Sequence, residues 1–156
     1  MIRRIGVVAL ALVVAVLSAA CSGQQPVPVT ATAGTKGRVI SVLVEQPALA
    51  AVRSDIDLFV TRRATRVSSG GGTADAIATT VKHGYRIDAV VLPSGTALNR
   101  VTDELLEPPL KLGTLHSTTY WACDIDRFGR PFVHFLTTAA SERVLRAHGF
   151  DVRPSP

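Results

Sequence analysis

The stretch with the clearest potential chemistry in this 156-residue sequence is Ser68-Ser69-Gly70-Gly71-Gly72-Thr73. Residues 64–67 before it fit a short strand, and apolar residues after it recur at helical spacing, at Ala74, Ile77, Ala78 and Val81. Glycines allow a tight turn, and the free N–H groups at a helix start carry partial positive charge. The stretch therefore predicts a loop that binds an anion through Ser68, Ser69, Gly70, Gly71 and Thr73. The alternative is a glycine-rich connection that binds nothing.

The segments around this loop predict alternating strands and helices. Strands are expected at 38–44, 64–67 and 87–92, and helices at 48–60, 73–83 and 97–106. This order is typical of an α/β fold with a mostly parallel sheet, flanked by helices that form right-handed crossovers.

Ligands bind such sheets beyond the carboxyl ends of the strands. Three loops are expected at that edge, 45–48, 68–73 and 93–96. Gln46 and Ser94 lie in the first and third loops, so we expect them to contact the ligand together with the serine and glycine stretch.

The C-terminal third of the chain is less regular. Residues 110–123 predict one or two strands, and 124–129 predict a turn. Helical segments are expected at 131–136 and 144–148, and Thr138 is suited to cap the second segment. Gly149, followed by the apolar Phe150, is typical of a helix end.

The N-terminal residues predict export. Met1-Ile2-Arg3-Arg4 is a short basic start, and an uncharged apolar run follows from Ile5 to Leu17. The segment 17–21 resembles a bacterial lipobox, in which the cysteine, here Cys21, becomes lipidated. The protein would then be held by lipid on the extracytoplasmic side of the cell membrane. The alternatives are an ordinary secreted protein cut near Ala20, and an uncleaved anchor.

Three regions follow from this interpretation. Residues 1–21 form the lipoprotein signal peptide, 22–37 form a disordered tether, and 38–152 form a single α/β domain. The net charge is +5, and loss of Arg3 and Arg4 leaves 15 basic residues against 12 acidic ones. Since no run of Lys and Arg with interleaved aromatic residues occurs, a nucleic-acid partner is not expected.

No motif predicts an enzyme, a cofactor or a metal. The chain has no G-x-S-x-G elbow, no lysine after the glycines as in a P-loop, and no G-x-G-x-x-G. The histidines have no partner at metal-ligand spacing and are expected at the surface or core edge: His83, His116, His134 and His148. Cys123 is expected to be buried and inert.

Two stretches together resemble the periplasmic molybdate-binding proteins of ABC transporters, which are class II solute-binding proteins. Residues 132–150 are similar to the final helices of that family, and 67–73 are similar to its F-G-S-S-G loop. The resemblance implies a domain like one lobe of such a protein, which binds a molybdate-like oxyanion and passes it to an ABC permease. The sequence departs from the family at Ala48, where the family has a second oxyanion-binding serine, and in length.

A chain long enough for about one lobe leaves a second hypothesis open. The protein would then be an interaction or structural lipoprotein without a small ligand, and its open face would meet another protein or a second copy of itself. An exposed apolar patch around Leu112, Leu115 and Trp121 would favour this hypothesis.

Overall fold

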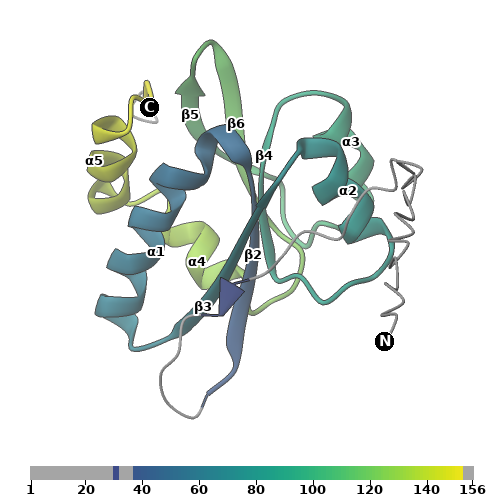
Figure 1. The fold of residues 1–156 in the computed structure, drawn as a ribbon, viewed down its shortest axis with the longest axis horizontal. Helices are drawn as coiled ribbons and strands as arrows, with labels where there is room; N and C mark the ends of the chain where they lie inside the picture. Colours follow the sequence, from purple (N-terminus) through teal and green to yellow (C-terminus); the bar gives the residue numbers. More distant parts are fainter. Residues whose placement is uncertain (1–29, 32–36, 153–156) are drawn as a thin grey trace, which may run out of the picture.

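The computed structural model describes residues 30–31 and 37–152, which form a three-layer α/β fold (Figure 1). Its sheet has six strands in the order β1-β3-β2-β4-β6-β5. The strands are β1 (Thr30–Ala31), β2 (Val39–Glu45), β3 (Arg66–Gly72), β4 (Ala89–Pro93), β5 (Leu110–Leu115) and β6 (Thr118–Asp124). The helices are η1 (Gln46–Ala48), α1 (Leu49–Arg63), α2 (Ala74–Lys82), α3 (Thr96–Val101), η2 (Thr102–Glu104), α4 (Arg130–Phe135) and α5 (Ala139–Ala147).

The sheet is parallel at its centre. Strand β2 pairs in parallel with β3 on one side and with β4 on the other. Strand β6 is antiparallel to β4, and β5 is antiparallel to β6, so β5 points the same way as the three central strands. The predicted α/β class with a mostly parallel sheet flanked by helices, like one lobe of a type 2 periplasmic-binding protein, is therefore confirmed.

Two apolar cores hold the helices against the sheet. On one face α1, α4 and α5 cover the strands, and on the other face α2 and α3 do so (Figure 1). Alternation along β2 supplies both cores, since Val42 and Val44 face the first set of helices and Leu43 faces the second. Phe59 and Phe132 meet edge to face in the first core, with ring centroids 5.4 Å apart.

Side-chain caps fix the helix ends that the sequence predicted. The Thr138 hydroxyl accepts from Ser141 N, so Thr138 is the N-cap of α5 as expected. Gly149 has a φ of 88° just after the helix, and Phe150 N donates to Leu145 O, which closes the predicted helix end. The expected helix at 97–106 is wrong in length, because the helical hydrogen bonds tighten into η2 (Thr102–Glu104) after Val101.

The segment 110–123 forms two strands, β5 and β6, and buries two of the three apolar side chains whose exposure would favour an interaction lipoprotein. Leu112 is 2% exposed and Leu115 is 4% exposed, while Trp121 is half-buried. The described residues therefore form no exposed apolar patch around Leu112, Leu115 and Trp121, since Leu112 and Leu115 belong to the first core. Asp151 bridges to Thr114, with backbone N–O distances of 3.0 and 2.8 Å.

Part of the predicted tether belongs to the sheet. Thr30–Ala31 is strand β1, which lies antiparallel to Ser68 and Ser69 of β3. These two residues were expected to be disordered. They form a strand because the outer edge of β3 offers unpaired backbone groups with which an extended segment can pair. The expected signal peptide and Cys21 lie outside the described residues. In the part of the chain that the structure describes, no helix is both long and apolar enough to cross a membrane.

Candidate functional site

The serine and glycine stretch is a strand rather than a loop. Strand β3 continues to Gly72 and pairs with β2 along its whole length. Ser69 therefore lies three residues before the strand end, which is roughly 10 Å at the usual rise of a strand. Ser68 is 4% exposed. The predicted loop conformation is wrong for 68–72, because β2 pairs with all of these residues and β1 pairs with Ser68 and Ser69 on the other side.

Close packing explains the glycine at position 71. A Cβ atom there would lie 2.5 Å from Leu49 Cδ2 and 3.0 Å from Gln46 Oε1. The start of α1 therefore packs directly on the backbone of β3, which only glycine permits without movement of these side chains. Glycine at position 71 is therefore explained by this packing contact within a strand and not by an anion.

Three predicted contacts do meet at the carboxyl edge of the sheet: Gln46, Thr73 and Ser94. Glu45 of β2 pairs with Gly72 of β3, so the chain leaves both strands at the same level, at Gln46 and Thr73. Ser94 follows β4, and its N–H donates to Thr119 O at 2.8 Å. All three side chains are exposed. We refer to Glu45, Gln46, Thr73 and Ser94 together as the carboxyl edge.

The hydroxyl of Thr73 is already partly engaged. It accepts from Ala76 N at 3.2 Å and so caps α2, which leaves its O–H hydrogen available to donate to a ligand. Asp75 in the first turn of α2 lies 3.4 Å from Arg100 Nη1 in an exposed ion pair. This acid weakens the attraction of the helix start for an anion.

Glu45 is the residue of this edge that the sequence analysis missed. Its side chain is half-buried, and Oε2 accepts from Tyr120 Oη at 2.7 Å. Among the described residues, Oε1 has no hydrogen-bond partner and remains available to a ligand. Burial raises the pKa of the Tyr120 phenol, and the bond to Glu45 and its charge raise that pKa further, so the phenol stays a donor.

A sequence signal for Glu45 existed. It is the first charged residue after the apolar run of β2, at the point where binding residues follow parallel strands. Its partner could not be found in this way, because Tyr120 lies 75 positions later in the chain.

The carboxyl edge carries negative charge and no cation of its own. The segments 45–48, 72–75 and 93–96 contain Glu45 and Asp75 but no Lys, Arg or His. An anion at this edge would therefore be held by backbone N–H groups and hydroxyls, close to the Glu45 carboxylate. Such an arrangement can discriminate between ligands by whether they bring a hydrogen to donate.

The remaining polar candidates lie apart from this edge. All four histidines are exposed, as expected: His83, His116, His134 and His148. Cys123 is a buried free thiol, also as expected, and burial together with the charge of Asp124 raises its pKa to about 12. Within residues 30–31 and 37–152, no group of three or more His, Cys, Asp or Glu side chains is placed to hold a metal ion.

The fold and the carboxyl edge define a class: a single α/β lobe with a polar edge at the ends of three parallel strands. No protein-family model matches the sequence, and no characterised protein matches it either. The likeness to molybdate-binding proteins therefore rests on the segments 67–73 and 132–150 and stays a prediction.

Proposed function

We propose that this chain is an exported, lipid-anchored solute-binding protein of one lobe, which binds a small oxyanion and passes it to an ABC permease. The observation that carries the proposal is the convergence of Gln46, Thr73 and Ser94 beyond the ends of β2, β3 and β4. Ligands of open α/β sheets bind at this place, where helix starts supply free N–H groups. Ser68, Ser69 and Gly70 are not part of the proposed site, since they lie inside β3.

The Glu45 carboxylate narrows the class of oxyanion. An ionised carboxylate only accepts hydrogen bonds, so it repels an oxyanion that has no proton. Sulfate and molybdate carry no proton at neutral pH, whereas inorganic phosphate still carries one and can donate it to Glu45 Oε1. The resemblance alone implied a molybdate-like ligand. We propose instead that the site prefers a protonated oxyanion of the phosphate type over molybdate.

Titration with four anions tests this preference. The purified protein is heated in the presence of phosphate, sulfate, molybdate or tungstate, and its melting temperature is measured. A ligand at 100 times its dissociation constant adds about 2.7 kcal/mol of stability, which is easily detected. We expect the largest shift with phosphate. Glu45→Gln, which supplies an N–H donor, should reduce the preference for phosphate over sulfate by roughly tenfold or more.

The matched control for this substitution is Glu142→Gln. Among the described residues, Glu142 forms an ion pair only with Arg146 of the same helix, so its substitution should leave the anion preference unchanged. A shift that is equal for phosphate and sulfate in the unaltered protein would contradict the role of Glu45. No shift with any of the anions would contradict the proposed function itself.

The alternative is an interaction lipoprotein without a ligand, and the residues that the structure describes do not provide the exposed apolar surface that would favour it. The side chains of Leu112 and Leu115, whose exposure would favour this alternative, are buried. Among the described residues, the only large apolar side chains that are mainly exposed are Tyr85, at 59%, and Leu106, at 51%. Dimerisation on a sizing column, together with no response to any anion, would favour this alternative over the proposed function.

A further inference from the structure

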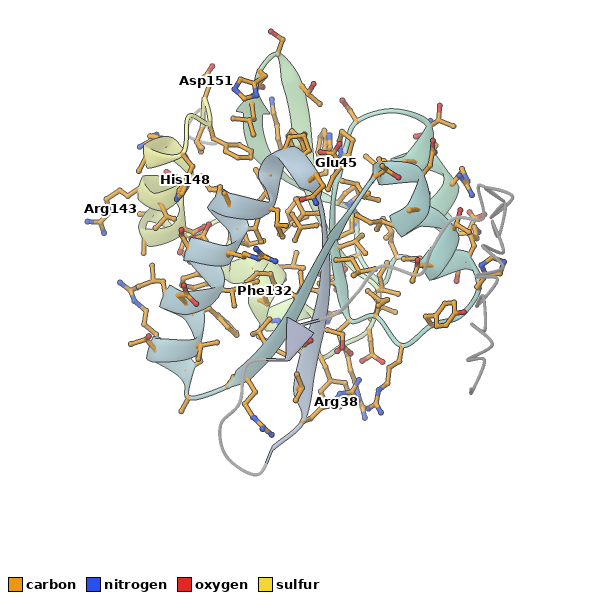
Figure 2. All side chains as sticks on the ribbon, in the orientation of Figure 1. Arg38, Glu45, Phe132, Arg143, His148 and Asp151 are labelled. Carbon is orange, nitrogen blue, oxygen red and sulfur yellow. The ribbon has the colours of Figure 1, made fainter. Side chains whose placement is uncertain are left out.

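A hollow lies at the opposite end of the sheet from the carboxyl edge. Its volume is about 390 Å³, within the range of small-molecule sites, and it is formed where β2 begins, below the end of α1. Figure 2 shows this separation, with Arg38 at one end of β2 and Glu45 at the other. Nothing in the proposed function uses this hollow, which we call the arginine pocket.

The inner wall of the arginine pocket is apolar. Ile40 is 5% exposed and Phe59 is 1% exposed, and both belong to the first core. The half-buried Phe128 forms a further wall, and its ring is covered by the guanidinium of Arg38, whose Cζ lies 3.3 Å from the ring centroid. The pocket therefore offers flat, apolar surface to a ligand before any ligand is bound.

Arg38 is held in place by acids outside the pocket wall. Its Nη2 donates to Oδ1 of the buried Asp88 at 2.7 Å and lies 3.6 Å from Asp126 Oδ2. Asp88 Oδ2 also accepts from Ser41 N at 2.7 Å, so both of its oxygens are bound. The charge of Arg38 is thus compensated, and its role in the pocket is to supply a fixed planar surface.

The other two arginines of the pocket are not compensated. Arg63 ends α1 and Arg127 lies in the turn before α4, and both are exposed. Neither forms an ion pair with any residue that the structure describes. Two guanidinium groups without a carboxylate partner among the described residues therefore line a hollow with apolar walls, and that of Arg127 also lies 4.9 Å from the centroid of the Phe128 ring.

We propose that the arginine pocket binds an organic carboxylate with an apolar body. The guanidinium groups of Arg63 and Arg127 match a carboxylate in geometry and charge, and each can bind it through two hydrogen bonds. The apolar body then packs on Phe128 and Pro131, which a bare inorganic anion cannot do. This site is independent of the carboxyl edge and of the oxyanion proposed there.

Calorimetric titration with phenylbutyrate tests the proposal on the full-length protein in a non-ionic detergent. Phenylbutyramide has the same apolar body without the charge, and sulfate has the charge without the body. We expect phenylbutyrate to bind at least about tenfold more tightly than either of these probes. The double substitution Arg63→Gln and Arg127→Gln should weaken phenylbutyrate binding by at least about tenfold.

Arg53→Gln is the matched control, since Arg53 is an exposed arginine of the same helix that does not line the pocket. It should leave phenylbutyrate binding unchanged, as should Thr73→Ala at the carboxyl edge. Because Arg63 and Arg127 are exposed, the double variant should melt like the unaltered protein. The proposal is overturned if phenylbutyrate does not bind, if the amide binds equally well, or if the double variant binds as before.

Discussion

Replacing Asp55 with asparagine is expected to raise the free energy of unfolding at pH 8 by about 2 kcal/mol, and to have little effect near pH 4. Asp55 lies in α1 with its side chain 0% exposed, and neither carboxylate oxygen has a hydrogen-bond partner within the described chain. The Oγ of Ser141, in α5, is buried and also unpaired. An ionised carboxylate in this place is costly, so its neutral counterpart should be tolerated better.

The pH dependence follows from the direction of the pKa change. Burial raises the pKa of Asp55 from 3.8 to about 7, and the Ser141 hydroxyl, which lies nearby but outside hydrogen-bond geometry, lowers that pKa only in part. The folded protein therefore binds the proton more tightly than the unfolded chain does. The stabilisation is complete below pH 3.8 and is lost as pH rises through about 7. A pKa change of this size corresponds to a free-energy difference of at most about 4 kcal/mol. Relaxation of the protein around the charge makes the difference smaller.

Urea denaturation at several pH values measures the effect. The free energy of unfolding of the unaltered protein should fall between pH 4 and pH 7 as Asp55 ionises. The Asp55→Asn variant has no carboxyl group there and should lack this part of the fall. Asp57→Asn is the control, because Asp57 is an exposed acid two positions away on the same helix. Parallel pH profiles of the unaltered protein and of Asp55→Asn would contradict a buried, mainly protonated Asp55.

The α/β class of the fold could be predicted because the order of strands and helices follows from the spacing of apolar residues within each segment. The apolar run at 39–44 and the helical spacing of Leu49, Val52, Ile56 and Phe59 are visible in the sequence. Alternation of such segments leaves few topologies for the central sheet. The observed order β3-β2-β4 at the centre is the arrangement that short right-handed crossovers produce.

The conformation of 68–72 could not be predicted, because serine and glycine have little preference of their own for strands. Whether they extend or turn depends on partners from elsewhere in the chain. Here β2 pairs with every residue of β3, and Thr30–Ala31 pairs with Ser68 and Ser69 on the other side. Gly71 then packs against Leu49, a contact that the sequence does not reveal.

Both candidate sites also depend on residues that are far apart in the chain. The bond between Glu45 and Tyr120 joins positions 75 apart, and both Arg63 and Arg127 line the arginine pocket. The two arginines look like ordinary surface charge in the sequence. The predicted convergence of Gln46, Thr73 and Ser94 was accessible because it follows from strand direction alone.

Gly129→Ala is expected to have the largest destabilising effect, roughly 3 kcal/mol or more. A Cβ atom at Gly129 would collide with the backbone carbonyl of Asp88, which cannot move like a side chain. That carbonyl accepts from Ile125 N at 3.0 Å and from Asp126 N at 3.1 Å, and so joins β4 to the turn before α4. Any shift of this backbone also disturbs the Asp88 side chain, which is buried and holds Arg38 at 2.7 Å.

Urea denaturation of Gly129→Ala beside Gly37→Ala separates this collision from the general effect of replacing glycine. A Cβ atom at Gly37 meets no atom within 4 Å, and its φ is not in the left-handed region, so Gly37→Ala should change stability by no more than about 1 kcal/mol. Equal stability of the two variants would mean that the turn at 126–129 moves away from Asp88 without cost. In that case Asp88 would not join β4 to the turn, and Arg38 would lack the fixed partner that orients it over Phe128.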